Sequence, residues 1–263
     1  MGIKASVIIP SLNRRDSLNR CLASLREQTC QDFETIVLTE EGDLAQIRNQ
    51  GAKIATGEIL VFIDDDVVCS PEWLSEILRS FTEGVDGCSG PAIIQAQYRQ
   101  QRDLFRFGWI KQLYDILFLS PDQHLPGHFT SAGAWTTGAS EEMCAYEGEV
   151  HFLEACNMAW RKEAFQAVGG FDEAYGGIGD WSEPDLAFRV RAAGGRLWFN
   201  PAARLTHCPD RTGAFTKRKK VGARLSNYYL FSSRWVRPCL RHTFYKLFLE
   251  SYYSWKRLSA FLS

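Results

Sequence analysis

The stretch Gly57-Glu58-Ile59-Leu60-Val61-Phe62-Ile63-Asp64-Asp65-Asp66 decides the fold of this chain of 263 residues. The apolar run that ends at Ile63 is typical of a buried parallel strand covered on both faces. Ser70 as N-cap and Pro71 as first helical residue then predict a helix, and apolar residues up to Phe81 recur at helical spacing. Ligands of open α/β sheets lie beyond the carboxyl ends of the strands, so these three carboxylates predict a ligand site.

The spacing of the carboxylates indicates what that ligand is. Side chains at i and i+2, such as Asp64 and Asp66, project to the same side of an extended segment. Mg²⁺ and Mn²⁺ prefer such oxygen ligands together with substrate phosphates, so a metal-bound diphosphate is expected. The alternative for an isolated triplet is a solvated acidic turn that stabilises the N-terminus of the next helix.

The segments around this stretch alternate between strand and helix patterns. Strands are expected at Ala5–Ile9 and Thr35–Leu38, and helices near Asp16 and over Leu44–Ala55. This order predicts a parallel sheet with right-handed connections. Further along, we expect a strand region at 84–97, a helix at 100–119, a long functional loop at 120–149, helices at 163–168 and 185–193, and a strand at 196–199.

Composition excludes several classes of protein. A chain with 45% hydrophobic residues can bury a full core, as one large α/β domain or a domain with a tail. No run reaches the roughly 18 to 20 apolar residues of a membrane span. The chain start shows no signal peptide and the eight cysteines have no C-x-x-C spacing, so we expect reduced thiols and a cytosolic location.

Charge is distributed unevenly between the two ends of the chain. Residues 204–257 hold 13 Lys and Arg against two acids, whereas the first 203 residues hold 17 against 29. The basic segment also carries aromatic residues from Tyr228 to Trp255, and helices of this composition lie in membrane interfaces. We expect peripheral attachment to an anionic membrane surface and no nucleic acid partner. The alternative is an amphipathic helical pair that packs back on the rest of the chain with its charges solvated.

Five motifs in this order resemble the family 2 glycosyltransferases, enzymes of the GT-A fold. They are Ser6-Val7-Ile8-Ile9-Pro10 with Asn13-Arg14, Arg48-Asn49-Gln50-Gly51, the stretch 57–66, Gly169-Gly170-Phe171-Asp172-Glu173, and Ser182-Glu183-Pro184-Asp185-Leu186 with Arg189. The resemblance covers residues 5–207 and is poor after about residue 215. It implies a mostly parallel, Rossmann-like sheet flanked by helices in a catalytic domain at 1–214, followed by a basic aromatic helical segment at 215–263.

The resemblance implies the activity and the roles of individual residues. Such enzymes transfer one sugar with inversion from a nucleotide diphosphate donor to a hydroxyl of a glycan or lipid-linked acceptor, as in surface polysaccharide or glycolipid assembly. Asp66 is then the direct metal ligand, Asp64 lies nearer the ribose, and His207 is a further metal ligand or phosphate contact. Phe231 replaces the glutamine of the Gln-x-x-Arg-Trp motif of processive synthases, which argues against processive synthesis.

By the same resemblance Glu183 is the catalytic base, although Ser182 stands where the family often has a second acid. UDP is the first guess for the nucleotide, and dTDP and GDP stay open because Thr39-Glu40-Glu41 replaces the usual pair of aspartates. The residues expected to bind the nucleotide sugar are Pro10, Asn13, Arg14, Glu40, Arg48, Asp64 and Asp65.

Two other functions stay open at this point. A nucleotidyltransferase could use a similar sheet, but no Gly-rich phosphate loop with a signature lysine follows the first strand. A nucleotide-sugar-binding protein without catalysis is suggested by Ser182 and by Thr39-Glu40-Glu41. It would bind the donor without hydrolysis or transfer.

Overall fold

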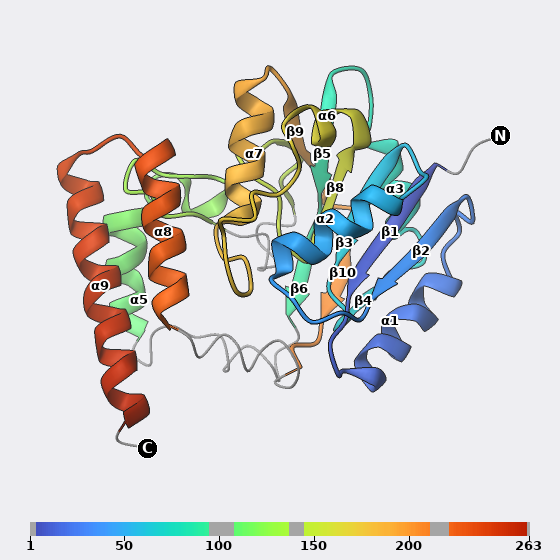
Figure 1. Cartoon of the computed structure of the whole chain (residues 1–263). Coiled ribbons are helices and arrows are strands. Elements are labelled where there is room, and N and C mark those ends of the chain that lie inside the picture. Colours follow the sequence, from blue (N-terminus) through green and yellow to red (C-terminus); the bar gives the residue numbers. More distant parts are fainter. Residues whose placement is uncertain (1–3, 95–107, 137–144, 211–220, 262–263) are drawn as a thin grey trace.

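The computed structural model describes residues 4–94, 108–136, 145–210 and 221–261, in which helices cover both faces of a seven-stranded sheet (Figure 1). The strand order is β2-β1-β3-β8-β5-β9-β7, and five strands run in one direction while β8 and β7 run opposite. These strands are β1 (Ala5–Pro10), β2 (Phe33–Leu38), β3 (Ile59–Ile63), β5 (Val85–Ser89), β7 (Gly148–Glu149), β8 (Asn157–Arg161) and β9 (Arg196–Phe199). The predicted α/β class and the mostly parallel sheet are confirmed.

The helices of the described residues lie in three groups. The sheet is covered by α1 (Arg15–Arg26), α2 (Leu44–Ile54), α3 (Trp73–Arg79), α6 (Lys162–Ala167) and α7 (Ser182–Ala192). Beside it lie α5 (Gly108–Tyr114), continued by the π-helical η1 (Asp115–Leu119), and the short 3-10 helix η2 (Asp122–His124). The chain ends in α8 (Val221–Trp235) and α9 (Leu240–Phe261).

Alternation along the central strands builds a core on each face of the sheet. Ile8 of β1 and Phe62 of β3 face one core with α2, α6 and α7, and Val7 and Val61 face the other with α1 and α3. Close packing of α2 on β1 requires Gly51, because a Cβ there would lie 2.5 Å from Cγ2 of Ile8. The predicted strands β1 and β3 are therefore buried on both sides, whereas the edge strand β2 is only partly buried.

The start of α3 differs from the prediction. The helix begins at Trp73, and the Ser70 hydroxyl donates to the Arg204 carbonyl at 3.1 Å, so its predicted N-cap role is wrong. Instead, Oε1 of Gln28 accepts the Leu74 N–H at 2.9 Å. An orphan donor of the first helical turn is thus satisfied by a residue 46 positions away, which no local pattern reveals.

A second, three-stranded sheet lies beyond the end of β3. It consists of β4 (Val67–Cys69), β10 (Leu205–His207) and β6 (Ala92–Ile94), in the order β4-β10-β6. Antiparallel pairing aligns His207 with Val67, the residue that follows Asp66. The sequence does not predict β4 or β10, since three residues are too few to show a period.

The C-terminal helices pack on the rest of the chain. Helix α9 lies along α8 and η1 at the side of the molecule away from β2 (Figure 1). Ten buried side chains form the aromatic cluster that joins these parts: Phe118, Ala132, Ala134, Tyr175, Trp181, Tyr228, Phe231, Tyr245, Leu249 and Tyr253. The tail is helical as predicted, while its basic run at 217–220 and part of the helix predicted at 100–119 lie outside the described residues.

Among the residues that the structure describes, no helix combines the length and apolarity needed to cross a membrane.

Candidate functional site

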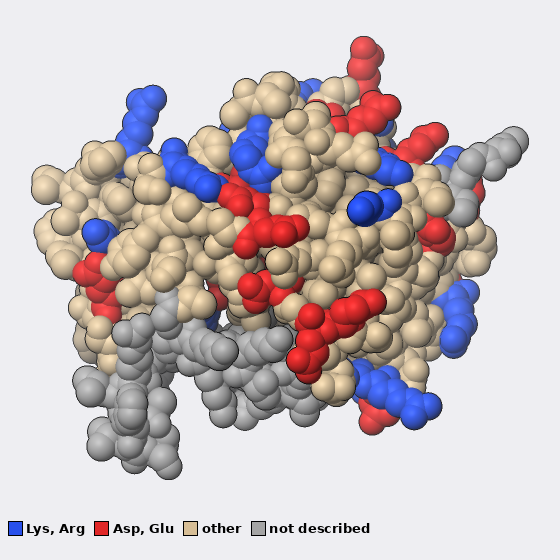
Figure 2. Space-filling model, in the orientation of Figure 1, with Lys and Arg blue, Asp and Glu red and all other residues tan. Residues whose placement is uncertain are grey.

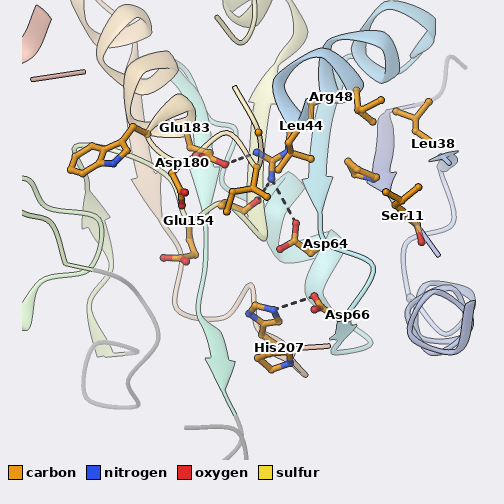
Figure 3. A pocket seen from close by; sticks show the side chains of 18 of the residues that line it. Ser11, Leu38, Leu44, Arg48, Asp64, Asp66, Glu154, Asp180, Glu183 and His207 are labelled. Atoms are coloured by element: carbon orange, nitrogen blue, oxygen red, sulfur yellow. Dashed lines mark hydrogen bonds and ion pairs between the residues drawn. The ribbon is translucent and has the colours of Figure 1, made fainter. Parts of the chain in front are cut away.

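A cavity of about 220 Å³ opens at the carboxyl ends of β1, β2 and β3 (Figure 3). This is where open α/β sheets hold ligands. Eight of the ten residues predicted to act in the site line the cavity: Pro10, Arg14, Glu40, Arg48, Asp64, Asp66, Glu183 and His207. The structure therefore gathers residues from widely separated parts of the chain, from Pro10 to His207, around one cavity.

Asp64, Asp66 and His207 form the metal-binding candidate. One ligand atom from each lies within 4.8 Å of the others, and Nε2 of His207 is 3.1 Å from Oδ1 of Asp66. Burial by itself would raise the pKa of Asp66, but its contacts with His207 and Arg14 outweigh this and lower the pKa to about 2. Two carboxylates and an imidazole suit Mn²⁺ or Mg²⁺, so the donor set fits a divalent cation.

Arg14 orients the Asp66 carboxylate. Its Nη1 donates to Oδ2 of Asp66 at 2.8 Å, and the backbone N–H of Asp210 donates to the same oxygen at 3.0 Å. The other carboxylate oxygen is the one that faces His207. Arg14 and Asp210 therefore act in the manner of outer partners that fix the direction of a metal ligand.

Asp65 and Asn13 lie outside the cavity lining. Asp65 is fully buried, accepts the Ser11 hydroxyl at 2.6 Å, and pairs with Arg14 at 2.8 Å. Burial raises the pKa of Asp65 to about 6 despite these contacts. Asn13 is exposed, with a φ of 57°. For Asp65 this placement favours a role in holding the ends of β1 and β3 together over the predicted donor contact.

Arg48 connects the metal side of the cavity with Glu183. Its Nη1 donates to Oε1 of Glu183 at 2.5 Å, and its Nη2 lies 3.7 Å from Oδ1 of Asp64 (Figure 3). The guanidinium is 1% exposed and also donates to the Ala155 carbonyl at 3.2 Å. Burial raises the pKa of Glu183, and Arg48 opposes the rise by stabilising the carboxylate. The carboxylate of the predicted base thus has one buried cationic partner among the described residues.

Asp185, one turn along α7, ties this helix to the C-terminal segment. Its fully buried carboxylate accepts from Arg189 Nε at 2.8 Å and the Tyr175 hydroxyl at 3.1 Å. It also accepts from Trp235 Nε1 at 2.9 Å and Arg234 Nη1 at 3.2 Å. The pair with Arg189 joins positions i and i+4 of one helix, a spacing that favours such a contact. The contacts from α8 span some 50 residues, and the only signal for them was the adjacent Arg and Trp.

A comparison with protein families matches residues 6–42 and 35–169 to "Glycosyl transferase family 2". The chain belongs to this family. The match ends before α7, so it covers the metal-side carboxylates and Arg48 but not Glu183 or His207. The expected sugar-transferring class of the chain is confirmed, and the roles of its individual residues stay predictions.

Curated relatives of this family 2 glycosyltransferase share about a fifth of its residues. The "Glucosyl-dolichyl phosphate glucuronosyltransferase" of Haloferax volcanii is 21% identical over 240 residues, which cover 78% of this chain and 69% of the relative. The "Pre-mycofactocin glycosyltransferase" of Mycobacterium tuberculosis is 22% identical over 222 residues, covering 77% of this chain and 42% of that relative. The chain therefore spans less than half of the mycobacterial protein.

Solved structures confirm the GT-A fold. "GalNAc-T7 with UDP, GalNAc and Mn2+" has a TM-score of 0.61 at 13% identity, covering 89% of this chain and 48% of that one. The "Mannosyltransferase PcManGT from Pyrobaculum calidifontis in complex with GDP-Man and Mn2+" has a TM-score of 0.58 at 15% identity, covering 97% and 72%. Both contain Mn²⁺, and the Asp-Asp-His group is consistent with Mg²⁺ or Mn²⁺ as cofactor.

The family 2 glycosyltransferase has further cavity residues that sequence reasoning missed. Glu154, Asp180, Trp135 and Trp181 line the same cavity as Glu183. The rings of Trp135 and Trp181 meet edge to face with centroids 4.0 Å apart, and Asp180 pairs with Arg224 of α8 at 2.8 Å. These residues come from loops without a periodic pattern, so only the fold reveals them.

Proposed function

We propose that this protein is a metal-dependent, inverting glycosyltransferase that transfers a single sugar from a nucleotide-diphosphate sugar. The observation that carries the proposal is the arrangement of Asp64, Asp66 and His207 opposite Glu183 in one cavity, with Arg48 between them. The acceptor is a hydroxyl of a glycan or a lipid-linked glycan in the assembly of a surface polysaccharide or glycolipid. The similarity to the Glucosyl-dolichyl phosphate glucuronosyltransferase of Haloferax volcanii supports the lipid-linked class.

On the donor side, the chain offers a metal site next to polar positions at three strand ends. A divalent cation held by Asp64, Asp66 and His207 would neutralise the charge that grows on the leaving diphosphate. Pro10, the last residue of β1, and Glu40, two residues after β2, line the cavity and are proposed to hold the nucleotide. UDP remains the first candidate, and the neighbours with UDP and with GDP-Man support testing both nucleotides.

On the acceptor side, Glu183 is proposed to take the proton of the attacking hydroxyl. The hydroxyl oxygen attacks the anomeric carbon on the face opposite the nucleotide diphosphate, and the bond to the diphosphate breaks in the same step. Burial raises the pKa of Glu183, which strengthens it as a base, while the Arg48 contact opposes the rise by stabilising the carboxylate. Glu154 and Asp180 are proposed to accept hydrogen bonds from other acceptor hydroxyls.

The domain division and the location belong to the same proposal. We divide the chain into a catalytic domain at 1–214 and a helical segment at 215–263, and the hydrogen bonds from Arg234 and Trp235 to Asp185 support treating both as one working unit. A lipid-linked acceptor would be presented at a membrane, so we include peripheral attachment of the protein to that membrane in the proposal.

The test measures nucleoside diphosphate release from UDP-, GDP- and dTDP-sugars with glycan or lipid-phosphate acceptors, with Mn²⁺ or Mg²⁺ and with EDTA. One donor should react in a metal-dependent manner, and Glu183→Gln should lower turnover by roughly 10²- to 10⁴-fold. Glu163→Gln, at an exposed position of α6, serves as the matched control and should react like the wild type.

Other outcomes would support the competing functions. Donor binding without release under every condition would favour a binding protein that lacks catalysis. Release of pyrophosphate in place of nucleoside diphosphate would identify a nucleotidyltransferase.

A further inference from the structure

Exposed apolar side chains concentrate on two helices, the continuous helix α5–η1 and α9. In the part of the chain that the structure describes, ten large apolar side chains are exposed, and eight of them belong to α5, η1 and α9. We call these eight the apolar face: Trp109, Leu113, Ile116, Leu117, Leu240, Phe244, Leu247 and Trp255. The remaining two, Ile54 and Tyr229, lie on other helices.

The two helices place these side chains on adjoining surfaces. Leu240, Phe244 and Leu247 follow each other at intervals of four and three residues, so they share one side of α9. Next to them, Arg241 donates to the Leu117 carbonyl at 2.6 Å and thereby ties α9 to η1. The ring centroids of Phe248 on α9 and Tyr114 on α5 lie 5.5 Å apart, which is a second contact between these two helices.

Helix α9 is apolar on two sides, but only one of them is covered by described residues. Tyr245, Leu249 and Tyr253 are buried in the aromatic cluster, whereas Leu240 is 80% and Phe244 63% exposed. A surface helix ordinarily turns polar residues outward. An exposed apolar surface of this kind marks an interaction site. The aromatic cluster holds one side of α9, while the apolar face on its other side is exposed in the part of the chain that the structure describes.

We propose that the apolar face docks the protein on an anionic lipid bilayer. The described residues 223–255 carry Arg224, Arg234, Arg237, Arg241 and Lys246 against Glu250. Arg224 pairs with Asp180, and Arg234 pairs with Asp172 and Asp185, so the cations that remain for an anionic surface are Arg237, Arg241 and Lys246. Figure 2 shows that the region of α8 and α9 is mostly uncharged on the face drawn.

The chemistry of the apolar face fits a bilayer surface. Trp109 and Trp255 have an apolar ring with a polar N–H, the combination enriched at membrane interfaces. In the proposed arrangement, α5 and α9 lie in the plane of the interface. Apolar residues enter the acyl boundary while neighbouring cations meet the anionic headgroups.

The experiment is flotation of the full chain with vesicles of phosphatidylcholine alone or mixed with phosphatidylglycerol. The wild type should bind the anionic vesicles more strongly. Phe244→Ser/Leu247→Ser should weaken binding by at least about tenfold, and Leu113→Ser/Ile116→Ser on the other helix should act similarly, because each removes two large inserted side chains. Ile54→Ser on α2, where the side chain is 60% exposed, is the matched control and should bind like the wild type.

Docking is tested independently of sugar transfer. Nucleoside diphosphate release from a soluble donor should be the same in all these variants, so failure of one proposal leaves the other standing. Unchanged vesicle binding in both double variants, or none by the wild type, would overturn the membrane assignment. So would a dimer, detected by light scattering, that the substitutions dissociate while vesicle binding is absent.

Discussion

The metal side and the base side of the cavity are built in different ways. On the metal side, Asp64 and Asp66 follow one strand directly, and the short β4–β10 pair adds His207. On the base side, Arg48 reaches Glu183 across 135 positions of sequence, and Trp235 reaches Asp185 across 50. The metal side is thus mainly a product of one sheet edge, whereas the base side exists only when α2, α7 and α8 pack together. Substitutions on the metal side should therefore change turnover with little effect on stability. Substitutions on the base side should change both turnover and stability.

The largest expected effect is on the metal side. Asp66→Asn should lower nucleoside diphosphate release by roughly 10²- to 10³-fold, because the site loses the charge that holds the cation near the leaving group. The matched variant is Asp65→Asn, whose carboxylate lies outside the cavity lining. It should mainly lower the thermal midpoint, because Asp65 joins Ser11 and Arg14 in the interior. Turnover that survives Asp66→Asn would remove the metal role of this residue.

A second expected effect concerns pH on the base side. Glu183 acts deprotonated, so turnover rises with pH through its pKa, which burial raises above the ordinary value of 4.5. Arg48 lowers this pKa, so Arg48→Met should raise it further and move the acidic limb of the kcat profile up by about 1 to 2 pH units. In Arg48→Lys, which retains a positive charge, the acidic limb should lie between those of the wild type and Arg48→Met.

A different result for Arg48 would weaken the distinction between the metal side and the base side of the cavity. If the acidic limb stays in place and only KM for the donor rises, Arg48 is a donor ligand, as the sequence predicts, and does not tune the base.

The smallest expected effect reports the coupling to the tail. Trp235→Phe removes the 2.9 Å hydrogen bond to buried Asp185, which keeps three other donors. It should lower the free energy of unfolding by about 1 to 2 kcal/mol, and kcat should fall a few-fold with KM for the donor unchanged. Trp255→Phe, at a position 62% exposed, is the control for stability and turnover. Equal behaviour of both variants would show that the Trp235 hydrogen bond does not stabilise the position of α7.

Several features could be predicted from the sequence because they are local. The apolar runs of β1 and β3 and the helical spacing in α1 and α2 need only neighbouring residues, so the parallel α/β sheet was within reach. The carboxylates of Asp64 and Asp66 follow β3 directly, and a strand's end is where α/β folds bind ligands. The helical character of the C-terminal segment follows from the same spacing of its residues.

Other features depend on contacts between distant segments. Gln28 replaces Ser70 at the start of α3, because the side chain that lies nearest in space satisfies the helical N–H. Glu154, Asp180 and the tail's contacts with Asp185 come from loops and helix ends, where no period marks them.

By itself, the sequence determined the order of strands and helices and the carboxylates at the end of β3, since hydrophobic periodicity and adjacency act within a few residues. Tertiary structure decided that His207 lies beside Asp66, that Arg48 pairs with Glu183, and which side of α9 stays exposed. The physical reason is that these outcomes depend on strand pairing and side-chain packing between segments far apart in the chain. Such contacts form only when the whole core closes.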